Sequence, residues 1–377
     1  MHHKYMNKSL LQLEDVQHHI VDIDKYIRGE MSEEECKEIA KEIANTGILL
    51  MKDSRVSEDD AERFLDFMEE YYSRPWEELE KDIYPEVAYQ YGLTPPKTEY
   101  PRGYTDEVQE WRRGVTDEHM PYTYRSQEEK TDEKMRFMWQ VGERDENSEW
   151  PSLNQKTPVP EGLTDMQPVL ETWGSKMLET AFTLSEILSI GFGWEKDTLR
   201  TMLKKGPHIL GPTGSELGEY TNADIGHVMT GLHDDTNLIT VHGASRFRGL
   251  VCWTKQGDPF LVTVPKGHLL CQAGRMLQYI TAGYAEAGMH EVVVLPELLE
   301  DVQMAKNEGR STTRVSSNLF VHLASNQVLQ PLGKFAETDD AIEYPPQYAG
   351  NFCMRTWVET KMIDESALDS LPEDPTV

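Results

Sequence analysis

A histidine and an aspartate two positions apart are the first residues in this sequence whose spacing suggests chemistry. The stretch Thr230–Gly243 reads TGLHDDTNLITVHG, in which His233 and Asp235 directly precede an apolar run. Side chains two apart on a strand point to the same face, so this imidazole and this carboxylate can converge. They would supply two of the three ligands of a 2-His-1-carboxylate site, which leaves open positions on Fe(II).

A second histidine can complete this ligand set. His290 follows Asp235 by 55 residues and opens another apolar run, HEVVVL. A strand that returns to the same end of a barrel would bring its imidazole to the first two ligands. The sequence therefore predicts a metal site formed by His233, Asp235 and His290.

An arginine and a serine with the same spacing predict an anion site beside the metal. Arg314 and Ser316 lie in RVSSNLFVHL and would share one face of a strand. A buried arginine needs an anionic partner. A guanidinium beside a hydroxyl suits a dicarboxylate whose other end is held by the metal, and 2-oxoglutarate has that shape. Arg310 is an alternative anchor.

The histidine pattern also has a simpler interpretation. The chain contains twelve histidines, so an HxD pair is expected by chance, and a solvated strand entry would explain it. The other histidines of this region are interpreted as packed or hydrogen-bonded structural residues: His208, His227, His242, His268 and His322.

Short strands are the elements expected to position these residues. Between about 208 and 322 the runs NLITVHG, GLVCWTK, FLVTVP, HLLCQAG, MLQYITAG, HEVVVL and RVSSNLFVHLA predict an antiparallel sandwich or barrel. PELLEDVQMAKNEG interrupts them as a helix that ends at Gly309.

The first half of the chain is predicted to be mainly helical. Ser32 and Glu35 form a capping-box pattern, and Gly47 ends that helix before a short strand at Ile48–Met51. A second helix covers SEDDAERFLDFMEEYYSRPWEEL, and residues 81–160 read as loops with short helices. TDMQPVLETWGSKMLETAFTLSEILSIGFG predicts a long helix that braces the sheet.

Composition limits the classes of partner. Sixty-six acidic against 37 basic residues give a formal net charge of −29, which disfavours nucleic acid and anionic membranes. Four cysteines without a CxxC pair favour a reducing compartment. We find no signal-peptide core and no long apolar span, and we expect a cytoplasmic monomer.

The motifs together resemble the isopenicillin-N-synthase-like, Fe(II)- and 2-oxoglutarate-dependent oxygenases. LHDDTNLITV, GLVCW, VPKGHLLCQAGRMLQYITAG, HEVVV and RVSSNLF follow the order of that family's core motifs. VDIDKY, ANTGILLMKD, RGYTDE, FMWQVGER and EWPSL resemble its N-terminal region, so the resemblance covers roughly residues 21–324.

The resemblance implies an all-β core with flanking helices (α+β), a double-stranded β-helix or jelly roll, in one structural domain. Its parts would be an N-terminal helical and loop region (1–160), a catalytic core with the bracing helix (161–332), and an irregular C-terminal tail (333–377). That tail could fold back as a lid or be solvated.

The resemblance also implies roles for individual residues. His233, Asp235 and His290 would bind Fe(II), and Arg314 and Ser316 would bind 2-oxoglutarate, with O2 as the other co-substrate. Arg102 and Tyr104 match a segment that often approaches the substrate. The reaction would oxidise a small organic molecule by hydroxylation, desaturation or oxidative cyclisation, and kainoid-like amino acids are one lead.

Departures from the family pattern concern the carboxylate anchor, for which Arg310 is a rival to Arg314, and two other functions also stay open. The usual Gly-Asp before LQ is Gly274-Arg275 here, and the segment between His290 and Arg314 is longer than is typical. One alternative is an Fe(II) oxidase of the same fold that does not use 2-oxoglutarate. The other is a barrel that binds a ligand without turnover.

Overall fold

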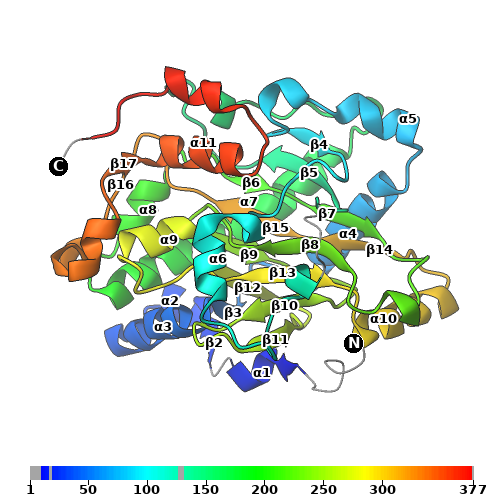
Figure 1. The fold of residues 1–377 in the computed structure, drawn as a ribbon, viewed down its shortest axis with the longest axis horizontal. Helices are drawn as coiled ribbons and strands as arrows, with labels where there is room; N and C mark the ends of the chain where they lie inside the picture. The colour runs from blue at the N-terminus through cyan, green and yellow to red at the C-terminus, as the bar shows by residue number, and fades with distance from the viewer. Residues whose placement is uncertain (1–9, 17–18, 126–130, 376–377) are drawn as a thin grey trace.

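The computed structural model describes residues 10–16, 19–125 and 131–375. The amino-terminal stretch at residues 1–19, in which we find no signal-peptide core, lies partly outside these residues. The described chain forms two large β-sheets surrounded by helices (Figure 1). None of its helices combines the length and apolar character needed to cross a membrane.

The smaller sheet carries two of the predicted metal ligands. Its strand order is β1-β11-β10-β13-β8, antiparallel except where β1 pairs with β11. These strands are β1 (Leu11–Gln12), β8 (Val228–His233), β10 (Leu250–Trp253), β11 (Pro259–Val262) and β13 (His290–Val293).

The larger sheet has the order β14-β7-β5-β6-β15-β9-β12-β3-β2, with β4 paired to β5. Its strands are β2 (Ile20–Asp22), β3 (Ile48–Lys52), β4 (Gly92–Thr94), β5 (Met135–Gln140), β6 (Ile209–Leu210), β7 (Thr213–Glu216), β9 (Ile239–His242), β12 (His268–Ala273), β14 (Thr313–Ser316) and β15 (Asn318–Val321). A separate hairpin joins β16 (Val328–Leu329) and β17 (Gln347–Tyr348).

Successive strands of the core alternate between the two sheets. From β8 the chain crosses to β9, returns to β10 and β11, crosses to β12, returns to β13, and ends in β14 and β15. Between the sheets Ile48 and Leu270 of the larger sheet pack with Cys252 and Phe260 of the smaller one. The prediction of a β core flanked by helices is therefore confirmed at the level of sheets and helices.

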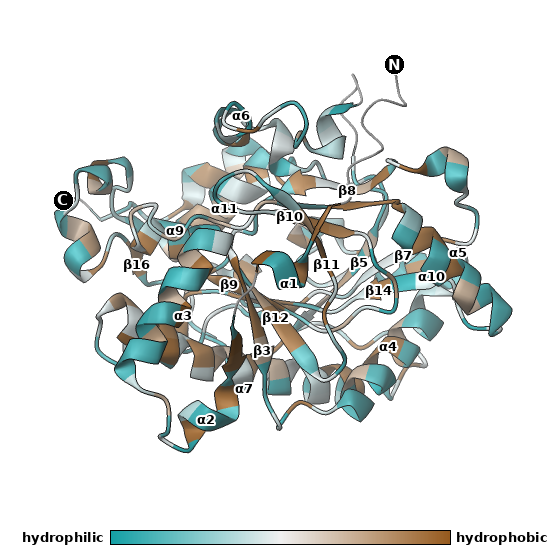
Figure 2. Cartoon of the chain, turned by 90° about the horizontal axis from the view of Figure 1, so that it is seen from below, coloured by the Kyte–Doolittle hydropathy of each residue, from teal (hydrophilic) through white to brown (hydrophobic). Residues whose placement is uncertain are grey.

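Helices cover the outer face of the larger sheet. Neighbouring side chains of a strand point to opposite faces, so Leu49 and Met51 of β3 point away from the second sheet. Both pack into the main core cluster together with helix residues. Figure 2 shows hydrophobic strands in the interior and hydrophilic helix faces outside. The helices are α1 (Leu13–Val16), α2 (Ile23–Ile27), α3 (Glu33–Thr46), α4 (Glu58–Tyr72), α5 (Trp76–Leu79), α6 (Asp106–Arg112), α7 (Met166–Phe192), α8 (Thr198–Leu203), α9 (Arg275–Ile280), α10 (Pro296–Asn307) and α11 (Ala349–Glu359).

Several local predictions are confirmed. Ser32 and Glu35 form both hydrogen bonds of a capping box on α3, and Gly47 caps that helix with φ +72°. The long α7 braces the sheet as expected and packs closely against α3. Gly191 of α7 makes this approach possible, because a Cβ there would lie 2.2 Å from the Cys36 carbonyl oxygen.

Three predictions about elements are wrong, and a fourth is wrong in part, because the helix expected over residues 57–79 is interrupted before Pro75 and forms α4 and α5. The run MLQYITAG is helix α9, because Met276, Leu277, Tyr279 and Ile280 bury one helical face rather than alternate faces. Residues 81–160, expected as loops and short helices, also contain strands β4 and β5.

The third concerns the tail, which is not irregular. It contains α11, an 11-residue helix whose buried residues join the main core. The proposed boundaries at 160 and 332 stay predictions.

Candidate metal centre and adjoining pockets

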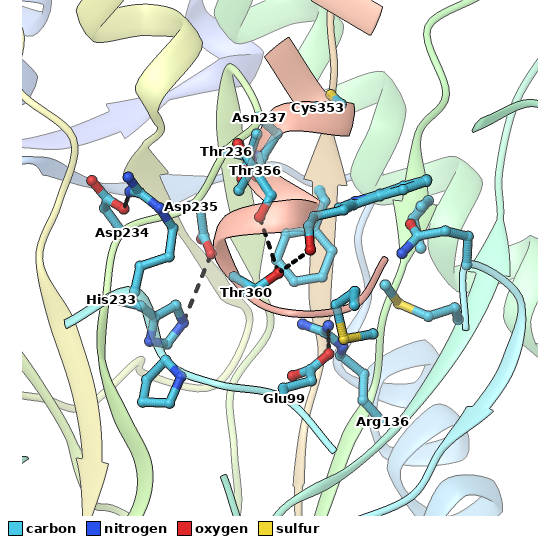
Figure 3. Close-up of a pocket in the computed structure, with 18 of the residues that line it drawn as sticks. Glu99, Arg136, His233, Asp234, Asp235, Thr236, Asn237, Cys353, Thr356 and Thr360 are labelled. Carbon is cyan, nitrogen blue, oxygen red and sulfur yellow. Dashed lines mark hydrogen bonds and ion pairs between the residues drawn. The ribbon is translucent and has the colours of Figure 1, made fainter. Parts of the chain in front are cut away.

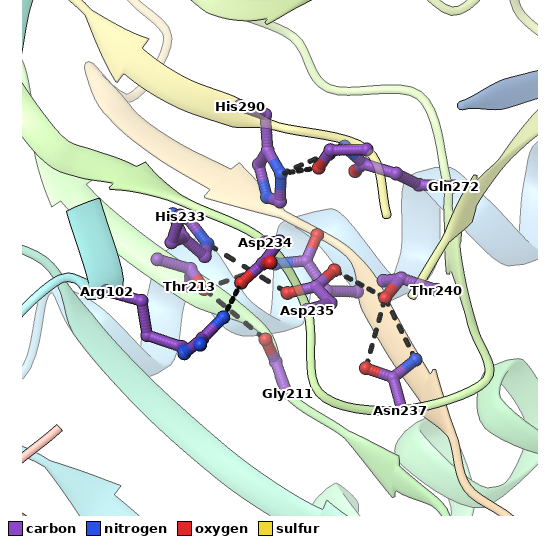
Figure 4. Close-up of polar contacts among 12 residues, drawn as sticks. Arg102, Gly211, Thr213, His233, Asp234, Asp235, Asn237, Thr240, Gln272 and His290 are labelled. Atoms are coloured by element: carbon purple, nitrogen blue, oxygen red, sulfur yellow. Dashed lines mark hydrogen bonds and ion pairs between the residues drawn. The ribbon is translucent and has the colours of Figure 1, made fainter. Parts of the chain in front are cut away.

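Pairing of β8 with β13 places the two predicted histidine ligands side by side. His233 is the last residue of β8 and lies opposite His290, the first residue of β13. Their ring centroids are 4.1 Å apart (Figure 4). Two imidazoles distant in the sequence thus share one end of the smaller sheet.

Asp235 reaches the same point from a turn rather than from the strand. Strand β8 ends at His233, and Asp235 Oδ1 lies 3.9 Å from His233 Nε2. Ligand atoms of His233, Asp235 and His290 all lie within 4.8 Å of one another. The Thr240 hydroxyl donates to Asp235 Oδ2, and the Arg275 N–H donates to the Asp235 carbonyl, which fixes the turn.

Each imidazole is oriented by a backbone carbonyl two residues before it. His233 Nδ1 lies 2.8 Å from the Gly231 oxygen, and His290 Nδ1 lies 3.0 Å from the Gly288 oxygen. A proton on Nδ1 satisfies both carbonyls and leaves each Nε2 lone pair free for a metal ion.

Electrostatics favour the ligand forms of two of these side chains. Burial, followed by the neighbouring His290, lowers the pKa of His233 well below its usual value, which keeps the imidazole neutral. Burial raises the pKa of Asp235, but His290, His233 and the Thr240 hydrogen bond outweigh it and lower the pKa overall. Two neutral nitrogens and one carboxylate oxygen fit an Fe(II) ion with open positions.

Asp234, between the two ligands of the turn, faces elsewhere. It forms a buried ion pair with Arg102, whose remaining guanidinium nitrogens bind Glu107 and Glu359. The guanidinium is 3 % exposed and contacts carboxylates through Nε and both Nη atoms. The Tyr104 ring lies edge-on to Tyr124 at 6.3 Å. Substrate binding by Arg102 and Tyr104 stays a prediction, and the structure gives Arg102 a set of carboxylate partners instead.

Arg314 and Ser316 share one face of β14, as the spacing predicts. The Arg314 guanidinium donates to the Ser316 hydroxyl and to the Phe247 carbonyl, and the residue is 4 % exposed. Among the described residues no carboxylate forms an ion pair with it, and burial lowers its pKa to about 10. Arg310, the alternative, is 42 % exposed at its side chain and bound to Glu308.

A small cavity beside this arginine is linked to the metal centre through hydrogen-bonded side chains. Arg314, Ser316, Asn318, His242 and Thr263 are among the residues that line it. His242 Nδ1 lies 3.0 Å from Asn318 Oδ1, and its Nε2 lies 3.2 Å from Gln272 Oε1. Gln272 Nε2 in turn donates to the Gly288 carbonyl, which is the same oxygen that orients the His290 imidazole, so the chain of contacts ends beside a predicted ligand.

The other histidines have protein partners. Those with contacts to backbone oxygens or side chains are His208 (Leu203 oxygen), His227 (Glu133), His242 (Asn318 and Gln272), His268 (Lys266 oxygen) and His322 (Phe320 oxygen). This agrees with their interpretation as structural residues, although His322 also lines the pocket described next.

A larger pocket opens on the other side of His233 and Asp235 (Figure 3). The pocket is partly open to solvent, and Pro101, Met138, Ile209, Phe320 and Trp357 are among the residues that line it. Helix α11 contributes Cys353, Thr356 and Trp357 to its wall, and the role of the tail as a lid stays a prediction.

Sequence reasoning missed several residues of this pocket. Arg136 and Met138 come from β5, a strand read as part of a loop region, because MRFMWQ lacks the strict apolar alternation of a half-buried strand. Trp357 comes from the helix missed in the tail.

Comparisons with known proteins give a fold. No family model and no curated protein sequence matches the chain. Solved structures do match. A full-length Neurospora crassa protein, solved in complex with alpha-KG and thymine, has a TM-score of 0.70 at 15 % identity, covering 90 % of this chain and 96 % of that one.

Two further structures agree. A putative 2OG-Fe(II) oxygenase family protein from Caulobacter crescentus has a TM-score of 0.68 at 17 % identity, covering 90 % and 98 % of the two chains. JOX2 in complex with 2OG, Fe and JA has a TM-score of 0.61 at 14 % identity, covering 97 % and 95 %. The chain therefore has the fold of 2-oxoglutarate- and Fe(II)-dependent oxygenases, and the resemblance seen in the sequence is confirmed for the fold.

Proposed function

We propose that this protein is an Fe(II)- and 2-oxoglutarate-dependent oxygenase that oxidises a small organic molecule. The proposal rests above all on one observation: a convergent His233, Asp235 and His290 set lies near a cavity with a buried arginine that lacks a carboxylate partner among the described residues. The alternation of the core strands between two sheets supports a double-stranded β-helix, and the neighbours that share the fold include complexes with 2-oxoglutarate and iron.

Each part of the site would have a distinct role. Fe(II), 2-oxoglutarate and O2 together supply an oxidant for C–H bonds, with succinate and CO2 as the other products. His233, Asp235 and His290 hold the metal, and the carbonyls of Gly231 and Gly288 orient the two imidazoles.

The second carboxylate of 2-oxoglutarate would be bound in the small cavity beside Arg314. Arg314 and the Ser316 hydroxyl would donate to it there, which supplies the anionic partner that a buried guanidinium needs. The substrate would lie in the larger pocket under α11, next to His233 and Asp235. Hydroxylation, desaturation and oxidative cyclisation are all compatible with this arrangement, including cyclisation of kainoid-like amino acids.

Binding measurements separate this proposal from its alternatives. Anaerobic titration with Fe(II), then with 2-oxoglutarate, is done on the parent, His233→Ala, Asp235→Ala and the control His268→Ala. We expect the first two variants to lose Fe(II) affinity at least tenfold and the control to keep it. Metal binding without 2-oxoglutarate binding or succinate formation would indicate the oxidase alternative, and no metal binding would indicate a non-catalytic barrel.

A further inference from the structure

One arginine of the larger pocket has an unused hydrogen-bond donor. Arg136 lies on β5 in register with Thr213 of β7, and its guanidinium carbon lies 5.7 Å from the centre of the Phe320 ring. Its Nη2 donates to Glu99 Oε1. Its Nε is buried and has no partner among the described residues. Arg136 and Glu99 lie together on one side of the pocket, with His233 and Asp235 on another (Figure 3).

Glu99, the one carboxylate among the described residues that pairs with Arg136, is shared with another cation. Glu99 Oε2 lies 2.9 Å from Lys134 Nζ, and Lys134 also pairs with Asp132. Lys134 therefore has two carboxylate partners, whereas Arg136 has one oxygen of a divided carboxylate. Arg102 also lines this pocket, but its guanidinium is bound to three carboxylates.

These surroundings lower the pKa of the Arg136 guanidinium and raise the pKa of the Arg102 guanidinium. Burial lowers the pKa of Arg136 to about 10, and the more distant Asp235 offsets this only in part. For Arg102 burial also lowers the pKa, but Asp234, Glu359 and Glu107 together raise it above its usual value. The Arg136 side chain is 20 % exposed, and a partly buried cation with few anionic contacts is stabilised by an added anion.

We propose that Arg136 binds a carboxylate of the substrate, so that the protein acts on a small organic acid with an apolar body. Met138, Leu153, Ile209, Phe320 and Trp357 supply the apolar wall beside it. An acid held at Arg136 extends along this wall toward His233 and Asp235. This inference rests on the proposed function only in taking the pocket as the substrate site.

The acid is distinct from 2-oxoglutarate by position. Arg314 and Ser316 of β14 line the small cavity, whereas Arg136 of β5 lines the larger pocket. The two arginines would therefore bind two different anions in one complex.

Straight-chain monocarboxylates test the inference directly. The full chain is loaded with Mn(II) and 2-oxoglutarate, and acetate through decanoate and their primary amides are titrated by calorimetry. We expect at least one acid to bind ten times or more tighter than its amide. Arg136→Met should remove that preference, and Arg136→Lys should keep part of it. Arg144→Met is the matched control, because Arg144 also has a buried Nε without a partner among the described residues but does not line the pocket.

Three other outcomes would overturn the inference. Absence of any acid preference in the parent would mean that the pocket takes neutral molecules. Arg136→Met could instead lower the affinity for acid and amide equally, with no recovery in Arg136→Lys. That result would make Arg136 a packing residue. A loss of 2-oxoglutarate affinity instead would make it the co-substrate anchor. If the acid preference holds but the parent forms no succinate with any acid, the anion site stands and the proposed oxygenase activity fails.

Discussion

Asp234 forms a buried ion pair with Arg102 directly behind the turn that carries His233 and Asp235. Arg102 also binds Glu107 of α6 and Glu359 of α11, and Arg275 of α9 contacts the same two carboxylates. The turn that carries Asp234 and Asp235, helices α6 and α11 and the start of α9 thus share one network of charges.

Breaking this ion pair should weaken both the fold and the metal site. Removing one partner of a buried pair typically costs about 3–5 kcal/mol, since the other charge stays buried. Arg102→Met should lower the free energy of unfolding by about that amount and weaken Fe(II) binding. The double variant Arg102→Met/Asp234→Asn should recover part of the loss, as measured by denaturant unfolding. Strictly additive effects would mean that the two side chains are energetically independent.

The anchor of 2-oxoglutarate can be assigned by a pair of arginine variants. Arg314 is buried and Arg310 is exposed and bound to Glu308. A charge-assisted contact contributes roughly 1.5–3 kcal/mol, so Arg314→Leu should weaken 2-oxoglutarate on the order of 10- to 150-fold. Arg310→Leu should leave the affinity unchanged. The reverse pattern in the calorimetric titration would move the anchor to Arg310.

Stability should fall as the pH is lowered from about 6.5 to about 4. Burial lowers the pKa of His242 and of His322 to about 4, whereas both titrate near 6.5 in an unfolded chain. The unfolded state therefore binds more protons within this window, and each histidine removes roughly 1.4 kcal/mol per pH unit there.

Denaturant unfolding at pH 7.5, 6 and 5 measures this slope. His322→Asn should flatten it, while His268→Asn, at a more exposed ring, should not. A slope identical in the parent and His322→Asn would show that His322 is accessible to protons in the folded state.

The contact between α3 and α7 should tolerate no side chain at Gly191. A Cβ there would lie 2.2 Å from the Cys36 carbonyl oxygen and 2.6 Å from Ala40 Cβ. Overpacking of this kind costs roughly 1–3 kcal/mol, more than the gain of up to about 1 kcal/mol in helix propensity. Gly191→Ala should therefore lower the midpoint of thermal unfolding, and Ser175→Ala on the exposed face of α7 should not. An unchanged midpoint in Gly191→Ala would mean that the helices separate without cost.

The sequence was informative where local patterns carry their own physical cause. The capping box at Ser32 and Glu35 and the left-handed cap at Gly47 are local rules and were correctly predicted. The HxD spacing predicted that His233 and Asp235 converge, and they do, although a turn rather than a strand carries Asp235.

What the sequence left unpredicted depends on tertiary context. The short apolar run at 275–280 is compatible with a strand or a helix, and packing selects the helix. Strand β5 is recognisable only once β4, β6 and β7 are present to pair with it. No sequence pattern predicts that Arg136 Nε lacks a hydrogen-bond partner among the described residues. It depends on the fold, in which Glu99 contacts Arg136 with one carboxylate oxygen and Lys134 with the other.

The pairing of β8 with β13 also determines when the metal centre can form during folding. His233 and His290 become neighbours only after the chain between them has closed into a loop containing core strands and α9. Loop closure costs entropy before the contacts that it permits are made, and nonlocal strand pairing is slow for that reason. A partly folded chain therefore holds at most two of the three predicted ligands together, so under the proposed function high-affinity iron binding would report completion of the β core.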